Sequence, residues 1–121
     1  MARLLILIGS GEMAPRMTRL HRTVLSRLGG RPKVTVIDTP YGFQSNADSL
    51  TGEAVEYFET KLGITPTVAS LRRSDADPLN LERAYAEIRD ADFVFSGPGS
   101  PSYAVRQWAA TRVAALLRGR L

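Results

Sequence analysis

The residues best placed to do chemistry lie in a glycine-rich stretch, Gly97–Tyr103, which follows the apolar run Phe93–Phe95 after one serine. This order predicts a buried strand, a tight turn and the start of a helix. Ser100 is a suitable N-cap, and Pro101 fits the first helical position, where no N–H is needed. Free backbone N–H groups at such a turn can bind an anion or a developing oxyanion. The candidate donors are Gly99, Ser102 and Tyr103.

Two further loops share this composition, Gly9–Pro15 and Asp38–Asn46. Each follows an apolar run, and in a parallel sheet ligands bind beyond the carboxyl ends of the strands. We therefore expect the three loops to converge on one edge of a sheet. Their polar and aromatic side chains are the candidate substrate-binding groups, namely Glu12, Phe43, Gln44, Asn46, Ser100 and Tyr103.

Several loop residues also have a purely structural interpretation. Glu12 precedes a predicted helix, where its charge would be favourable against the helix dipole. Tyr41 and Phe43 lie on a predicted loop, where exposed aromatic rings can form the wall of a pocket. Phe43 has a second interpretation, in which it fills the edge of the sheet. Asp38 would hold its loop by accepting backbone hydrogen bonds. The sequence leaves these alternatives open.

The loop Gly9–Ala14 also matches the permissive dinucleotide-binding fingerprint, with alanine in the third glycine position. Asp38 follows the next predicted strand, where a ribose-binding carboxylate would lie. Pro15 follows at once, however, and Glu12 would bring negative charge near the pyrophosphate. A tight strand-to-helix turn would select glycine in any case. A phosphate- or nucleotide-binding module that uses Gly9–Ala14 is the alternative function.

The sequence offers no complete set of residues for covalent catalysis. It has no cysteine, and no Gly-x-Ser-x-Gly elbow occurs. The single histidine, His21, falls mid-helix among arginines, which predicts a surface position rather than a catalytic base. No pair of histidines or cysteines has metal-site spacing, so neither a metal nor a cofactor is expected.

The hydrophobic pattern alternates strands and helices along the chain. Apolar and β-branched runs predict strands at 4–8, 34–37, 67–71 and 93–95. Helical spacing predicts helices from about residue 15 to 28, at 47–62, after Asp77-Pro78, from Pro101 and over 113–117. Residues 1–121 are thus predicted to form a single flavodoxin-like α/β domain, with a parallel sheet of about four strands and helices on both faces.

Length and composition limit the remaining possibilities. With 121 residues, of which 44% are hydrophobic, the chain suits one domain with a modest core but is short for a complete doubly wound sheet. That shortness favours a fragment or an obligate homo-oligomer. No apolar run reaches the roughly 18 residues of a transmembrane helix, so we expect no membrane contact and a cytoplasmic location.

The net charge of +4 is carried mostly by arginine. Arg16, Arg19, Arg22 and Arg27 share the first predicted helix, and the others are spread over loops and the C-terminal end. No aromatic residues interleave with them to form a stacking platform for bases. On sequence grounds, nucleic acid is therefore not an expected partner.

Three blocks together resemble the class I glutamine amidotransferase-like superfamily, most closely its dipeptidase E and cyanophycinase branch of serine peptidases. The blocks are Leu5–Glu12, Thr39–Asn46 and Asp92–Tyr103, and they are spread over most of the chain. The resemblance implies a serine peptidase-like or amidotransferase-like hydrolase that acts on a small peptide or amide.

In that family, the glycine turn after the corresponding strand supplies oxyanion-hole N–H groups. By resemblance, Gly97 and Gly99 take that role. The family's nucleophile lies on an elbow after the next strand and its histidine lies further on, whereas this sequence ends at Leu121. The resemblance therefore implies the N-terminal half of a longer hydrolase domain, which lacks the nucleophile and the catalytic histidine and is inactive alone.

Overall fold

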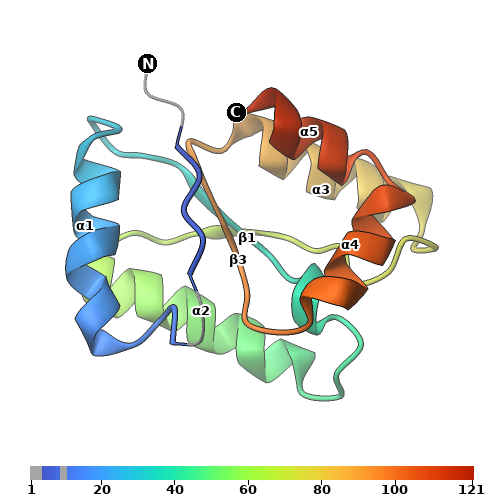
Figure 1. Ribbon diagram of the computed structural model, residues 1–121, viewed down its shortest axis with the longest axis horizontal. Helices are drawn as coiled ribbons and strands as arrows, with labels where there is room; N and C mark the ends of the chain where they lie inside the picture. Colours follow the sequence, from blue (N-terminus) through green and yellow to red (C-terminus); the bar gives the residue numbers. More distant parts are fainter. Residues whose placement is uncertain (1–3, 9–10) are drawn as a thin grey trace.

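The computed structural model describes residues 4–8 and 11–121, which are arranged around a parallel sheet of three strands (Figure 1). β1 (Val34–Ile37) lies in the middle, between β2 (Thr67–Ala69) and β3 (Phe93–Ser96). Thr35 of β1 is the register partner of Thr67 on one side and of Val94 on the other. The strands predicted over these three segments are confirmed.

All four residues of β1 are buried, as a strand covered on both faces requires. Because side chains alternate along a strand, Val34 and Val36 point to one face, and Thr35 and Ile37 point to the other. The buried Thr35 hydroxyl is not left unpaired, since it accepts a hydrogen bond from the Thr67 hydroxyl at 2.8 Å. β1 therefore joins two separate apolar cores.

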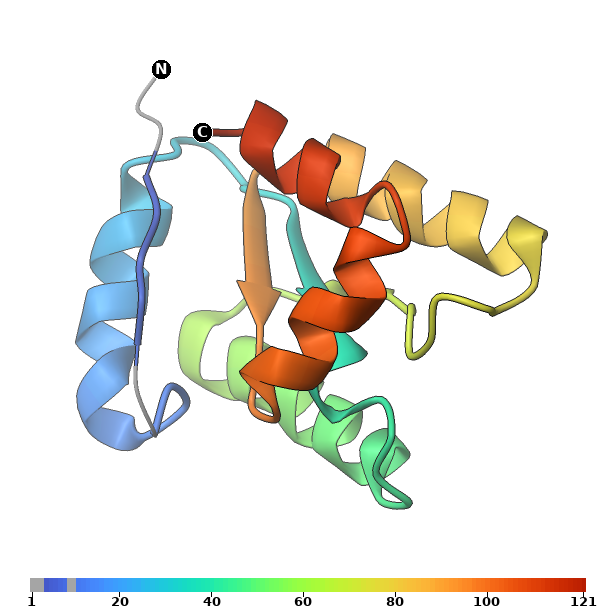
Figure 2. The same cartoon turned by 45° about the vertical axis from the view of Figure 1, so that its right-hand side comes forward.

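Helices cover both faces of the sheet, as predicted (Figures 1 and 2). On the Val34 face, residues of two helices pack with Phe95 around Phe58. On the Ile37 face, three helices contribute to a second core around Ile88. The helices of the first face are α1 (Thr18–Ser26) and α2 (Ala47–Leu62), and those of the second are α3 (Pro78–Asp90), α4 (Pro101–Ala109) and α5 (Val113–Gly119).

Local signals set the ends of these helices. α2 has the predicted bounds and stops at Gly63, whose φ of 69° is left-handed. The Asp77 carboxylate accepts a hydrogen bond from the Leu79 N–H at 2.8 Å, and Pro78 opens α3. Two short 3₁₀ helices, η1 (Pro15–Met17) and η2 (Thr39–Tyr41), precede α1 and follow β1. None of the helices in the described part of the chain has the length and apolar character needed to cross a bilayer.

The predicted first strand, at 4–8, is wrong, and so is the expectation of about four strands, because the described residues form three. Residues 4–8 belong to no strand. Leu4, Leu5 and Leu7 are 55%, 61% and 86% exposed, so the run is not buried either. Both sides of the central strand are taken by β2 and β3, which pair with β1 directly. An apolar run favours burial, but its composition does not specify which strand it pairs with.

Candidate functional site

Two of the three predicted loops meet at the carboxyl ends of β1 and β3. The Ser100 N–H donates to the Pro40 carbonyl at 2.8 Å, which joins the turn after β3 to η2. The backbones are also in direct contact, because a Cβ placed on Gly99 would lie 2.2 Å from the Pro40 oxygen. The predicted convergence of Asp38–Asn46 and Gly97–Tyr103 is confirmed.

The third loop reaches the same edge in its described part. Gly9 and Ser10 lie outside the described residues, but Glu12 is placed beside the turn after β3. A Cβ added to Gly97 would lie 3.5 Å from the Glu12 Oε1 atom. The Glu12 carboxylate is therefore next to a predicted oxyanion-hole residue. The loop leads into η1 rather than directly into an α-helix, and no strand over 4–8 precedes it, which differs from the setting of a dinucleotide fingerprint.

Gly97 and Gly99 adopt a backbone conformation that favours glycine, with φ of 135° and 137°. Between them Pro98 has no N–H, so these two glycines carry the remaining amide hydrogens of the turn before Ser100. The predicted donor at Tyr103 is occupied, because its N–H is bound by the Ser100 Oγ at 3.1 Å. Ser100 thus caps α4, as predicted. The backbone N–H groups that are left as candidate oxyanion donors are those of Gly97, Gly99 and Ser102. Ser102 lies on the first turn of α4.

Asp38 holds the ends of β1 and β2 together. Its side chain is only 1% exposed. One carboxylate oxygen accepts the Leu71 N–H at 2.7 Å, and the other accepts the Ser70 hydroxyl at 2.8 Å and Arg72 Nε at 3.2 Å. All of its partners belong to the chain that follows β2. The structural interpretation of Asp38, as an acceptor that orders a loop, is therefore the one the geometry supports.

Arg72 is a site residue that the sequence did not single out. It forms ion pairs with Asp38 and with Asp48 on the first turn of α2. The hydrogen bond to Asp48, followed by the one to Asp38, raises the pKa of Arg72, so its charge is fixed. Its carbonyl accepts the Tyr103 hydroxyl at 2.6 Å. Arg72 therefore connects β1, α2 and α4, and no local sequence signal marks contacts so distant along the chain.

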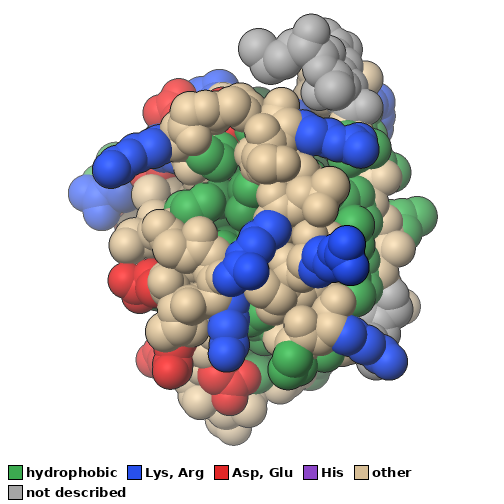
Figure 3. Space-filling view, turned by 90° about the vertical axis from the view of Figure 1, so that its left-hand side faces the viewer, with side chains coloured by type: hydrophobic (Ala, Val, Ile, Leu, Met, Phe, Trp, Pro, Cys, Tyr) green, Lys and Arg blue, Asp and Glu red, His purple; other side chains and the backbone are tan. Residues whose placement is uncertain are grey.

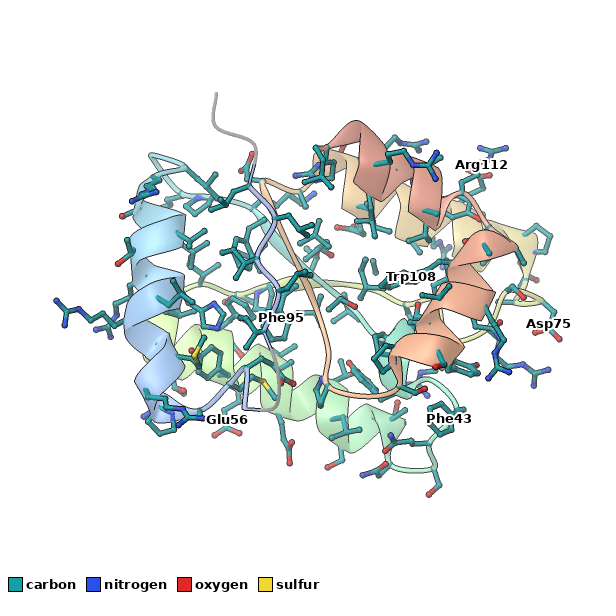
Figure 4. All side chains as sticks on the ribbon, viewed as in Figure 1. Phe43, Glu56, Asp75, Phe95, Trp108 and Arg112 are labelled. Atoms are coloured by element: carbon teal, nitrogen blue, oxygen red, sulfur yellow. The ribbon has the colours of Figure 1, made fainter. Side chains whose placement is uncertain are left out.

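Phe43 and Tyr103 form an aromatic pair at the outer side of this edge. Their ring centroids are 4.8 Å apart, and Phe43 is 56% exposed. Figure 4 places Phe43 beside the start of α4, away from the two cores. Phe43 is therefore an exposed residue at this edge and not a buried plug. Gln44 is half-buried and Asn46 is exposed in the same loop, without a described side-chain hydrogen bond.

The loop position of Tyr41 predicts an exposed side chain beside Phe43. That prediction is wrong, because Tyr41 is completely buried. Its hydroxyl is 2.8 Å from the Thr51 Oγ1 atom. Burial raises the pKa of Tyr41 above the ordinary 10.0, and the charge of Asp38 adds to this, while Thr51 and Arg72 act in the opposite direction. The fold thus favours the neutral phenol.

This burial predicts an alkaline transition. Since the folded pKa of Tyr41 lies above its unfolded value, the stabilisation is complete below pH 10 and is lost as pH rises through the folded pKa. Ultraviolet titration of the phenolates should show a late component that is lost in Tyr41→Phe. Tyr85→Phe is the matched control and should retain that component. A titration unchanged by Tyr41→Phe would contradict this assignment.

His21, predicted at the surface, is buried with 2% exposure. It lies among aromatic rings, with the centroids of Tyr57 and Phe95 at 5.7 and 5.9 Å. Its Nε2 atom is 2.8 Å from the Glu12 carbonyl oxygen, so its proton on that nitrogen ties α1 to the Glu12 loop. His21 lies at helical spacing from Met17 and Val24, and this spacing is the sequence signal that would have predicted its burial.

The described residues contain no group of three histidine, aspartate or glutamate side chains that could hold a metal ion. The site is instead formed by backbone turns that contact one another. Its charged groups include Glu12 and the Arg72 guanidinium with its partners Asp38 and Asp48. No family model, no curated protein and no solved structure matches this chain.

Proposed function

We propose that this chain is the N-terminal part of a flavodoxin-like hydrolase domain of the peptidase or amidotransferase type. The observation that carries the proposal is the contact between two loops, made by the hydrogen bond from the Ser100 N–H to the Pro40 carbonyl. It fixes the turn Gly97–Ser100 at the carboxyl edge of a parallel sheet, where α/β proteins bind ligands. The sequence blocks that resemble the dipeptidase E branch include both loops.

In this proposal, the N–H groups of Gly97 and Gly99 stabilise the oxyanion that develops when a peptide or amide carbonyl is attacked. Backbone donors held by a rigid turn need no reorganisation during the reaction. The left-handed φ values of both glycines are consistent with a turn built for a special backbone direction. Phe43 and Tyr103 form the apolar wall beside it.

Glu12 constrains the substrate. A carboxylate close to Gly97 would repel an oxyanion, so its role is to bind a positive group on the same molecule. The free ammonium group of a small peptide meets this requirement. The proposed substrate is therefore a short peptide or amide with a free amino end, held between Glu12 and the Phe43–Tyr103 pair.

A binding experiment tests this arrangement in the 121-residue chain. In ¹⁵N-labelled protein, a dipeptide amide should shift the backbone signals of Gly97 and Gly99, and its N-acetylated form should shift them less. Glu12→Gln should weaken binding by about tenfold, the order expected for loss of one charge-assisted contact. Glu53→Gln, an exposed change on α2, is the matched control. No shift at millimolar dipeptide, or equal effects of both variants, would contradict the proposal.

The proposal also requires a nucleophile from further sequence. We expect no peptide or amide hydrolysis by the 121-residue chain alone, and a coding sequence that continues past Leu121 into a strand, a Gly-x-Ser or Gly-x-Cys elbow and a later histidine. A stop codon after Leu121 would overturn the hydrolase proposal. A rise in melting temperature with dinucleotides or phosphate, and none with peptides, would instead favour the module that uses Gly9–Ala14.

A further inference from the structure

α1 presents a row of arginines on its outer side. Its members are Arg16, Arg19, Arg22 and Arg27, all exposed, and they extend over η1, α1 and its C-cap. The opposite side of the helix is buried through His21, Val24 and Leu25. Figure 3 views this side of the molecule and shows lysine and arginine side chains gathered across it, with acidic side chains toward one margin. The fold thus leaves the four arginines of the first predicted helix together on one exposed surface.

A hollow lies beside this row, between α1 and the C-terminal end of α2. It is lined by Pro15, Thr18, Arg19, Arg22 and Lys61. Arg22 is held there, because its NH2 group donates to the Lys61 carbonyl at 2.9 Å. The Thr18 hydroxyl lies 3.3 Å from the Tyr57 hydroxyl and supplies a polar floor. A guanidinium fixed in advance loses less entropy when it binds an anion.

These cations are not neutralised within the described part of the protein. The ion pairs found among residues 4–8 and 11–121 do not include Arg19, Arg22 or Lys61. α1 itself, with the sequence TRLHRTVLS, contains no acidic residue that could pair with a neighbour on the helix. Three positive groups around one hollow, without a carboxylate, form a site for an anion such as a phosphate.

We propose that the arginine row and the hollow bind the phosphate backbone of a nucleic acid duplex, with one phosphate between Arg19, Arg22 and Lys61. From Arg16 to Arg27 the row extends for about 16 Å at 1.5 Å per residue. That length exceeds one phosphate and fits several successive phosphates of a strand, which recur about every 3.4 Å along the duplex axis. This proposal uses residues separate from the turn Gly97–Ser100 and is independent of the hydrolase proposal.

Other anionic surfaces fit the row less well. A bilayer surface is bound best by helices that insert several apolar side chains. α1 directs Val24 and Leu25 into the core and exposes one large apolar side chain, Leu20, which is 38% exposed. A single strand calls for aromatic rings on which bases stack. Among the described large hydrophobic side chains that are exposed, Phe43 is the one aromatic, and it lies at the carboxyl edge of the sheet. Contact through phosphates alone, without base recognition, is what the row can provide.

The test is fluorescence anisotropy with a labelled 20-bp DNA duplex between 20 and 200 mM salt. Five cations that each neutralise one phosphate should give a slope of about −4 to −5 in log K against log salt. Arg19→Gln with Arg22→Gln should reduce this slope by about 2 and weaken binding at least tenfold at low salt. Arg83→Gln with Arg89→Gln, on exposed positions of α3, removes the same charge elsewhere and should have little effect.

Several results would overturn the proposal. The first is that the unmodified chain does not bind the duplex at 20 mM salt. The second is that the two double variants lose equal affinity for the duplex. The third is that the chain binds inorganic phosphate or anionic vesicles but does not bind the duplex. Thermal melting of each variant checks that the fold is intact. Should Arg22→Gln unfold the chain through its lost bond to Lys61, Arg16→Gln with Arg27→Gln tests the same row without that bond.

Discussion

Replacing Asp38 with alanine should destabilise the fold by about 3 kcal/mol, because it removes a buried carboxylate together with its partners' hydrogen bonds. The Leu71 N–H is itself buried and would be left without an acceptor. The Ser70 hydroxyl is exposed and Arg72 is 37% exposed, so water can replace part of what these two lose. The backbone donor therefore accounts for most of the expected cost. For a domain stabilised by about 5–15 kcal/mol, this is a large fraction.

Urea denaturation of Asp38→Ala measures this loss as a lower midpoint at an unchanged slope. Asp38→Asn keeps an oxygen acceptor for the Leu71 N–H, so its urea midpoint should lie between those of Asp38→Ala and the unmodified chain. Asp48→Ala is the matched control, because Asp48 binds the same arginine but is 93% exposed, and exposed pairs contribute little. If Asp38→Ala cost no more than Asp48→Ala, the carboxylate would not be holding the ends of β1 and β2 together.

The sequence could predict the features that depend on neighbouring residues. The bounds of α2 followed from its apolar spacing and Gly63, and the caps at Asp77 and Ser100 followed from the Ser-Pro and Asp-Pro pairs. A helix end is decided within one turn of the chain. The same locality explains why the loops were located correctly, since Gly and Pro mark where each strand must stop.

Features that depend on distant partners could not be predicted in the same way. Arg72 binds residues 34 and 24 positions away, and neither distance is visible in a local pattern. The apolar run at 4–8 has the composition of a buried strand, but composition does not determine pairing. In the described part of the chain, this run pairs with neither of the outer edges that β2 and β3 leave open. The loop position of Tyr41 and the arginines beside His21 both suggest exposure, although each side chain is surrounded in the fold by residues from other elements.

Part of the candidate site was therefore accessible from sequence and part was not. The glycine turn and the Phe43 loop were identified as components, and their contact through Pro40 and Ser100 required the structure. This contact also separates two reasons for a glycine, which the sequence cannot distinguish. One reason is a left-handed φ, and the other is the absence of space for a Cβ atom.

Gly99→Ala should be the most damaging glycine substitution, because both reasons apply to it. Its φ of 137° strains any L-residue, and its new Cβ would lie 2.2 Å from the Pro40 oxygen and 2.8 Å from the Tyr41 nitrogen. Those atoms are backbone and cannot move aside as a flexible side chain could. Overpacking and backbone strain together should cost about 3–5 kcal/mol and break the hydrogen bond from Ser100 to Pro40.

Two other glycines separate these effects. Gly63→Ala meets only strain, since its φ is 69° and nothing lies within 4 Å, so it should cost about 1 kcal/mol. Gly42→Ala meets only a clash, because its φ is −61° and its Cβ would lie 2.6 Å from the Arg72 Cα atom. The urea midpoint should therefore be highest for Gly63→Ala, lower for Gly42→Ala and lowest for Gly99→Ala. A Gly99→Ala variant as stable as Gly63→Ala would mean that the turn does not pack on η2, and the basis for placing an oxyanion hole there would be lost.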